Sequence, residues 1–225
     1  MDMEHIIITG ASRGIGLGLT KFCLTQGNHV LGVGRKPLSA ELKELSDKFP
    51  GRLQLLEIDL NDKEAPSKIA EAIYDWPCLD LLFNNAGVLI TGEDRQDFEE
   101  SFLTNAIVPF LLLKSLLPKL KESDYPRAIQ ISSLMGSITD NSSGGYYAYR
   151  SSKAALNMMI KSLSLDEPTI NSILIHPGWV RTRMGGEQAP LSIETAVHGI
   201  MKVVQTVRPD QSGHFFDYTG RELSW

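Results

Sequence analysis

The sequence predicts an α/β fold in which one doubly wound parallel sheet of about seven strands is covered by helices on both faces. Short apolar runs alternate with longer amphipathic stretches along all 225 residues. Several of these runs are apolar at consecutive positions, which is typical of strands covered on both sides. Short connections between the runs indicate successive parallel β-α-β units. We therefore expect a single domain over residues 1–225.

Seven segments are predicted as strands. They are residues 5–9, 30–34, 53–58, 79–83, 128–132, 170–176 and, with a weaker pattern, 213–218. The first helix is expected over residues 14–26, and the second over 40–48 with Ser39 as its cap. A third helix is expected to start at Asn61, with Glu64 at the reciprocal capping position. Longer helices are expected over about 97–117, 149–165 and 193–206.

Composition limits the function classes. The formal net charge is −5, so nothing indicates a general attraction to nucleic acid or to an anionic membrane. No segment approaches the roughly 20 apolar residues of a membrane span, and the first residues lack the basic region of a signal peptide. Cys23 and Cys78 form no CxxC pattern, which favours a reduced, cytoplasmic setting. No His, Cys and carboxylate cluster has metal-ligand spacing, and no metal is expected.

A glycine-rich turn, TGASRGIG at residues 9–16, directly follows the first predicted strand and opens the first helix. Gly10, Gly14 and Gly16 would let the backbone approach a pyrophosphate, whose charge the helix N-terminus favours. A turn between a strand and a helix also prefers glycine, so the glycine spacing alone leaves both interpretations open.

The charges around this turn favour one cofactor. Between His5 and Ala40 the chain has no Asp or Glu, whereas Arg13 and Arg35 are basic. An acid at the end of the second strand binds the ribose 2′-OH in NAD sites, and a nearby Arg accommodates the 2′-phosphate of NADP. Arg35 lies at this strand end and predicts NADP(H). The alternative is a solvated basic surface.

Tyr149 and Lys153 lie four residues apart on one face of a predicted helix. A nearby ammonium lowers the pKa of a phenol from its usual value of about 10, which makes tyrosine a competent acid or base at neutral pH. Ser132 and Ser133 end the fifth predicted strand, and only one of them is expected to face the cleft at the carboxyl edge. Its hydroxyl could bind a substrate carbonyl oxygen; alternatively, both serines cap the strand end.

Together these residues resemble the short-chain dehydrogenase/reductase superfamily over the whole chain. Asp59-Leu60 is similar to its adenine-contacting pair, Asn84-Asn85-Ala86-Gly87 to its NNAG turn, and Pro177-Gly178 with Val180 and Thr182 to its nicotinamide-binding segment. The residues that the resemblance implies for cofactor binding are Gly10, Ser12, Arg13, Gly14, Ile15, Gly16, Arg35, Asp59, Leu60, Asn85, Ala86, Gly87, Tyr149, Lys153, Pro177, Gly178, Val180 and Thr182.

Four residues, Asn105, Ser133, Tyr149 and Lys153, fall where the family has its catalytic tetrad. The resemblance implies hydride transfer between nicotinamide and a small carbonyl or alcohol. Tyr149 would protonate the oxygen that Ser133 holds, Lys153 would lower the Tyr149 pKa and bind the ribose, and Asn105 would anchor a water. The SxxG register from Ser133 to Gly136 favours Ser133 over Ser132. The C-terminal part further resembles the compact carbonyl-reductase branch that includes C-factor and sniffer proteins.

Alternatives stay open for function and assembly. A nucleotide-binding regulator would keep the fold without turnover, although the intact tetrad argues against it. A sugar-nucleotide epimerase or dehydratase usually needs a larger C-terminal substrate domain than the 43 residues after Thr182 provide. The two long helices at 97–117 and 149–165 could pair in a homodimer or could be buried within a monomer. The substrate itself is expected under residues 181–191.

Overall fold

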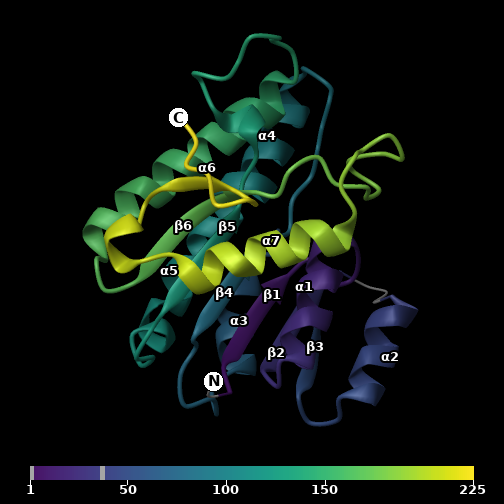
Figure 1. The fold of residues 1–225 in the computed structure, drawn as a ribbon, viewed down its shortest axis with the longest axis vertical. Helices are drawn as coiled ribbons and strands as arrows, with labels where there is room; N and C mark the ends of the chain where they lie inside the picture. Colours follow the sequence, from purple (N-terminus) through teal and green to yellow (C-terminus); the bar gives the residue numbers. More distant parts are fainter. Residues whose placement is uncertain (1–2, 36–38) are drawn as a thin grey trace.

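The computed structural model describes residues 3–35 and 39–225 and contains one parallel sheet with the strand order β3-β2-β1-β4-β5-β6-β7 (Figure 1). The strands are β1 (His5–Thr9), β2 (His29–Gly34), β3 (Leu53–Glu57), β4 (Leu81–Asn84), β5 (Arg127–Ile131), β6 (Asn171–His176) and β7 (Phe215–Asp217). The order reverses between β1 and β4, where open α/β sheets bind their ligands. The predicted doubly wound parallel sheet is confirmed.

Helices cover both faces of the sheet (Figure 1). The helices α1 (Gly14–Thr25), α2 (Ala40–Lys48) and α7 (Ile193–Thr206) contribute to one apolar cluster. The helices α3 (Ala65–Ala72), α5 (Val108–Leu120) and α6 (Tyr147–Asp166) contribute to the other. Alternate strand residues point to opposite faces, so Ile6 and Ile8 join the first cluster and Ile7 joins the second. This two-sided burial explains the continuous apolar run in β1.

The third helix begins later than the sequence predicts. It starts at Ala65 rather than Asn61, and Glu64 precedes it without making a side-chain cap. The Asp62 carboxylate accepts a hydrogen bond from the Glu64 N–H, which stabilises a turn instead of a helix. Pro66 then falls in the first helical turn, where its missing N–H costs nothing. Ser39, by contrast, caps α2 as predicted, with its Oγ accepting from the Leu42 N–H.

The long helix predicted over 97–117 is divided into three parts. The first is α4 (Arg95–Phe102), the second a π-helical segment over Leu103–Ile107, and the third α5. Together they form 26 helical residues whose most apolar window has a mean hydropathy of 1.4, enough by length and composition to cross a membrane. Half of that window is buried inside the molecule, as in the core helix of a globular domain. Asn105 lies in the π-helical segment, a feature that is frequent at functional sites.

Candidate active site

A cleft of about 950 Å³ opens at the carboxyl edge of the sheet, where the strand order reverses. It brings together motifs that lie far apart in the sequence. The predicted residues that line it are Gly10, Ser12, Arg13, Gly14, Ile15, Arg35, Asp59, Leu60, Asn85, Ala86, Gly87, Asn105, Tyr149, Lys153, Pro177 and Thr182. A volume of this size suits a ligand larger than a single small substrate.

The glycine-rich turn joins β1 to α1 at this cleft. Gly10 has a φ of +67°, and a Cβ on Gly16 would lie 2.2 Å from the Gly10 carbonyl oxygen, so Gly16 serves the close packing of the turn rather than the cleft wall. The first turn of α1 has no acidic residue and no side-chain cap. The buried Ser12 Oγ has no hydrogen-bond partner among the described residues. Free N–H groups, a free hydroxyl and no negative charge fit the pyrophosphate of a dinucleotide.

The NNAG turn is held against the glycine-rich turn by hydrogen bonds. The Asn85 Nδ2 donates to the Thr9 carbonyl oxygen at 2.9 Å. The Thr9 hydroxyl accepts from the N–H groups of Asn85 and Ala86 at 3.0 and 3.1 Å. The Asn84 Nδ2 donates to the Pro109 carbonyl oxygen at 2.9 Å, which ties the turn to α5. These bonds fix the two turns that flank the switch point of the sheet.

Arg13 and Arg35 line the end of the cleft that lies beside β2. Both side chains are exposed, and no ion pair or hydrogen bond of their guanidinium groups is found within residues 3–35 and 39–225. Lys36, the next basic residue, lies outside the described residues. Near the same end, the Asn61 and Thr104 side chains bond each other at 3.1 and 3.2 Å.

Tyr149 and Lys153 lie on α6 and are both buried, with 7 % and 5 % of their surface exposed. The Lys153 Nζ donates to the Ile131 carbonyl oxygen at 2.8 Å, and burial lowers its pKa to about 8. Burial also raises the pKa of Tyr149, although a side-chain hydrogen bond with Ser133 opposes that rise. The expected lowering of the Tyr149 pKa by Lys153 is not found, because removing the phenol from water outweighs the other effects.

The two serines at the end of β5 use their hydroxyls differently. The Ser133 Oγ accepts from the Met135 N–H at 3.2 Å and lies close enough to the Tyr149 phenol to lower its pKa. The Ser132 Oγ donates to the Asn157 Oδ1 at 2.6 Å. Ser132 is among the residues that line the cleft and Ser133 is not. The Ser132 hydroxyl, however, is already hydrogen-bonded to Asn157 of α6. The hydroxyl that accompanies Tyr149 is therefore that of Ser133.

Asn105 holds the segment that follows the NNAG turn. Its Oδ1 accepts from the Val88 N–H and its Nδ2 donates to the Val88 carbonyl oxygen, both at 2.9 Å. The Nδ2 also donates to the Ser152 hydroxyl at 3.1 Å. The side chain of Asn105 thus joins the π-helical segment, the cleft wall and α6. Its expected part in anchoring a water stays a prediction.

Besides Gly16, two predicted cofactor residues do not line the cleft. Gly178 has a φ of +83°, and a Cβ there would lie 2.3 Å from Leu191 Cδ1. Val180 is buried and forms a β-bridge with Leu191. Both hold the segment after β6, while their neighbours Pro177 and Thr182 face the cleft. Lining residues that the sequence analysis did not identify are Gly34, Ile58, Asn61, Val88, Leu89, Glu100, Thr104, Ile131 and Ile193. Arg183 and Met184 also line the cleft, and they lie in the segment 181–191 that is expected to cover the substrate.

Most of these missed residues are sequence neighbours of a motif. Val88 and Leu89 extend the NNAG turn, and Asn61 follows Asp59-Leu60. Extending each motif by two residues would have found them. Glu100, in α4, carries no such signal and reaches the cleft only through the packing of its helix.

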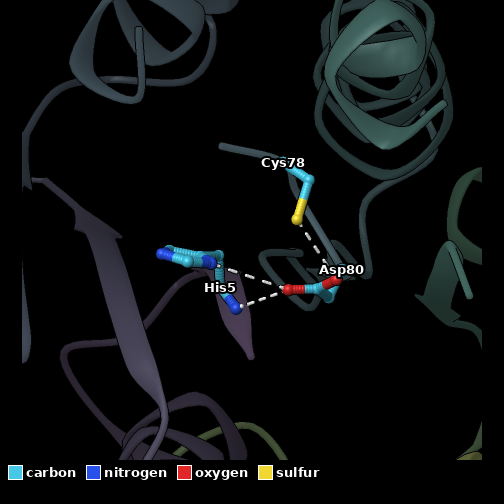
Figure 2. A group of neighbouring side chains, drawn as sticks. All are labelled: His5, Cys78 and Asp80. Carbon is cyan, nitrogen blue, oxygen red and sulfur yellow. Dashed lines mark hydrogen bonds and ion pairs between the residues drawn. The ribbon is translucent and has the colours of Figure 1, made fainter. Parts of the chain in front are cut away.

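A second cluster of titratable side chains lies at the opposite, amino edge of the sheet (Figure 2). Ligand atoms of His5, Cys78 and Asp80 lie within 4.8 Å of one another, a grouping that the sequence spacing does not show. The Asp80 carboxylate accepts from the His5 N–H at 2.8 Å, from the Ser123 hydroxyl at 2.6 Å and from the Cys78 thiol at 3.4 Å. Burial, with the charge of Asp80, raises the pKa of Cys78 to about 11, so the thiol stays protonated at neutral pH. Hydrogen bonding among protein groups accounts for this cluster.

Comparisons with known proteins agree with the fold and the cleft. The family model for short chain dehydrogenase matches residues 4–191. The C-signal protein of Myxococcus xanthus is 41% identical over 65% of this chain and 93% of its own length. Short-chain dehydrogenase RED3 of Pyricularia oryzae is 31% identical and covers 98% of both chains.

Solved structures give the same result over the full chain. The carbonyl reductase Sniffer of D. melanogaster superposes with a TM-score of 0.91 at 37% identity, and covers 100% of both chains. The NADPH-bound carbonyl reductase from chicken fatty liver superposes with a TM-score of 0.92 at 32% identity, again over 100% of both chains. The sequence match, the strand order and the cleft at the switch point together show that this chain is an oxidoreductase that belongs to the short-chain dehydrogenase family.

Proposed function

We propose that this protein is an NADP(H)-dependent reductase of small carbonyl compounds in which Tyr149 is the proton donor. The observation that carries the proposal is that the Tyr149 phenol lies close enough to the Ser133 hydroxyl for that group to lower its pKa, beside the buried Lys153, all at the carboxyl edge of the sheet. Perturbed titratable groups that share a cleft are candidates for acid–base chemistry.

The bound reduced cofactor would supply a hydride to the carbonyl carbon of the substrate. Tyr149 would donate its phenolic proton to the carbonyl oxygen, so that the product is an alcohol. The Ser133 hydroxyl would bind the same oxygen as negative charge develops on it. The raised pKa of Tyr149 keeps the proton on the phenol at neutral pH, which suits an acid in the reductive direction. Lys153 would carry its ammonium one helical turn away.

The proposed preference for the phosphorylated cofactor rests on Arg13 and Arg35. Both line one end of the cleft, and no partner engages either of them in the part of the chain that the structure describes. Guanidinium groups bind phosphate oxygens well. Related structures support the proposal: the chicken carbonyl reductase was solved with NADPH, and reductases from Burkholderia multivorans and Pseudomonas aeruginosa were solved with NADP.

The acid role is tested by replacing Tyr149 with Phe. Turnover of a panel of aldehydes, ketones and quinones should fall on the order of 10²- to 10⁴-fold, because the proton donor is lost. Cofactor affinity, measured by fluorescence titration, should stay nearly unchanged, because little volume is removed. Tyr147→Phe is the matched control, since Tyr147 is exposed in the same helical turn. A Tyr149→Phe enzyme with near-normal kcat would refute the acid role.

The cofactor preference is tested by titrating NADPH and NADH. We expect about 10²-fold tighter binding of NADPH from two partly screened phosphate contacts. Arg35→Ala and Gly34→Asp should each reduce this ratio, whereas Lys21→Ala, which removes an exposed charge of α1, should not. Equal affinities in the unaltered protein would rule out the preference. A ratio that resists both changes at the end of β2 would place the phosphate contact elsewhere, with Arg13 the first residue to replace.

A further inference from the structure

Arg150 directly follows Tyr149 in α6 and does not belong to the predicted tetrad. We propose that Arg150 is a positioning residue, which holds the turn before α6 and thereby sets the Tyr149–Ser133 pair. The inference rests on the proposed function, because it concerns the same two hydroxyl groups.

All three guanidinium nitrogens of Arg150 donate hydrogen bonds, which link α6 to the loop at residues 143–145 and to Met135. The Nε donates to the carbonyl oxygens of Gly144 and Gly145 at 3.2 and 3.1 Å. The Nη2 donates to the Ser143 hydroxyl at 2.8 Å, and the Nη1 donates to the Met135 carbonyl oxygen at 3.4 Å. A planar guanidinium can point donors in these directions at once, whereas a lysine ammonium on a flexible stem cannot.

The turn that Arg150 holds is strained. Three consecutive residues, Gly144, Gly145 and Tyr146, have φ values of 66°, 65° and 52°. Within residues 3–35 and 39–225, Tyr146 is the single non-glycine residue with a positive φ. Such a conformation persists only where surrounding contacts determine it. The two carbonyl groups that precede Tyr146 are the ones that Arg150 binds, so the guanidinium supplies those contacts.

Helix stability does not explain an arginine at this place. Arg150 lies in the first turns of α6, where a positive charge opposes the helix dipole. Most of residues 138–144 are exposed, and several hydrogen bonds of this loop stay within it, such as those from Ser142 to Asp140 and from Gly144 to Asn141. The loop therefore depends on contacts from outside, and Arg150 provides three of them, to Ser143, Gly144 and Gly145.

The same contacts reach the two hydroxyl groups of the site. The Met135 carbonyl oxygen accepts from Arg150, and the Met135 N–H donates to the Ser133 Oγ. On the other side, Arg150 and Tyr149 are neighbours in α6. Losing the guanidinium would remove the Met135–Arg150 hydrogen bond between the Ser133 segment and the start of α6, and would loosen the contact between Ser133 and Tyr149. That contact lowers the pKa of Tyr149 against the effect of burial, so its loss should raise the pKa further.

The experiment compares Arg150→Met and Arg150→Lys with Arg208→Met, a control in which the lost guanidinium bonds an exposed Asp210 far along the chain. Amide hydrogen exchange over residues 139–146 should become faster in both Arg150 variants and stay unchanged in the control. The kcat should fall about 10- to 100-fold because the catalytic groups are misplaced, while cofactor affinity is retained. The alkaline limb of the kcat profile should move to higher pH.

A double-mutant cycle sharpens the test. Gly145→Ala strains the same turn without touching the guanidinium, because a Cβ there has no neighbour within 4 Å. If Arg150 acts by holding this turn, the losses in kcat from Gly145→Ala and Arg150→Met should combine to less than their product. Fully multiplicative losses would contradict the proposal.

The outcomes separate this inference from the proposed function. Unchanged hydrogen exchange in Arg150→Met would overturn the inference, and so would faster exchange with an unaltered kcat and pH profile. The exchange measurement needs no turnover and no cofactor. A failure of Tyr149 as the acid would show in the Tyr149→Phe kinetics, while the exchange data would still report whether Arg150 holds the turn.

Discussion

The two edges of the sheet differ in how far hydrogen bonds offset the effect of burial on the pKa of titratable groups. At the amino edge, burial raises the pKa of Asp80, but hydrogen bonds from the His5 N–H, Ser123 and Cys78 together outweigh it and hold the pKa below its usual value (Figure 2). At the carboxyl edge, burial prevails, and it lowers the pKa of Lys153 and raises that of Tyr149. Protein groups compensate the buried charge at one edge and leave it poorly compensated at the other.

This difference indicates which edge of the sheet has charged groups available to a ligand. A compensated charge stabilises the folded state and has no donor or acceptor left for a ligand. A poorly compensated one lowers stability and is available to a bound molecule, which is the usual trade-off between stability and activity. The contrast predicts that removing the buried charged group, Lys153 at one edge and Asp80 at the other, changes stability in opposite directions.

The largest expected effect comes from Lys153→Met. Turnover should fall on the order of 10²- to 10⁴-fold, and cofactor affinity should fall too, because the ammonium at the cleft wall is lost. At neutral pH and without cofactor, the free energy of unfolding should rise by up to about 3 kcal/mol, because a buried charge is removed. Kinetics and urea unfolding of the same preparation check both. A variant that is both inactive and less stable would contradict the predicted difference in stability change between the two edges.

The two serines of β5 offer a comparison within the carboxyl edge. Ser133→Ala should cost roughly 2–4 kcal/mol of transition-state stabilisation, measured as kcat/KM, because its hydroxyl accompanies the Tyr149 phenol. Ser132→Ala should leave kcat/KM nearly unchanged but cost about 1–3 kcal/mol of stability, because the buried Asn157 Oδ1 loses its donor. The reverse ranking in kcat/KM would assign the oxygen-binding role to Ser132.

The pH dependence of stability should carry the signature of Lys153. Its pKa is about 8 in the folded protein and 10.5 ordinarily, so below about pH 8 the cost of the buried ammonium is fully present. Between these values the folded state releases the proton first, and the free energy of unfolding rises with pH by up to about 3 kcal/mol. Subtracting the unfolding free energy of Lys153→Met from that of the unaltered protein at each pH removes the contributions of the other titratable groups. Parallel profiles for the two proteins would contradict the assignment.

The smallest effect is expected at the amino edge. Asp80→Asn should lower the free energy of unfolding by about 1.5–3 kcal/mol at neutral pH, because hydrogen bonds to a charged acceptor are weakened. The contribution of Asp80 is present above its ordinary pKa and is lost as the pH falls through its lowered value. Turnover should not change, and Asp75→Asn, at an exposed neighbour, should alter neither quantity. A loss of turnover in Asp80→Asn would contradict this prediction and show that the two edges are energetically coupled.

Local chemistry made much of the fold and of the site predictable from sequence. The bounds of β1, α2 and α7 follow from patterns within a few residues, such as the apolar run of β1 and the Ser39 cap. Tyr149 and Lys153 share a face because the helical period places residues four apart together. The glycine-rich turn and the NNAG turn have their residues adjacent in sequence, so their motifs were visible before the sheet brought them together.

Other features depend on contacts between distant segments, and only the tertiary structure decided them. The different surroundings of Ser132 and Ser133 come from Asn157 and Tyr149, which lie on another element. The Asp80 cluster joins His5 to a residue 75 positions away. The direction of the Tyr149 pKa depends on how much water the assembled core removes from the phenol. Sequence therefore determined what local periodicity and backbone sterics control, whereas burial and long-range hydrogen bonds, which arise only when the chain is packed, decided the electrostatics of the site.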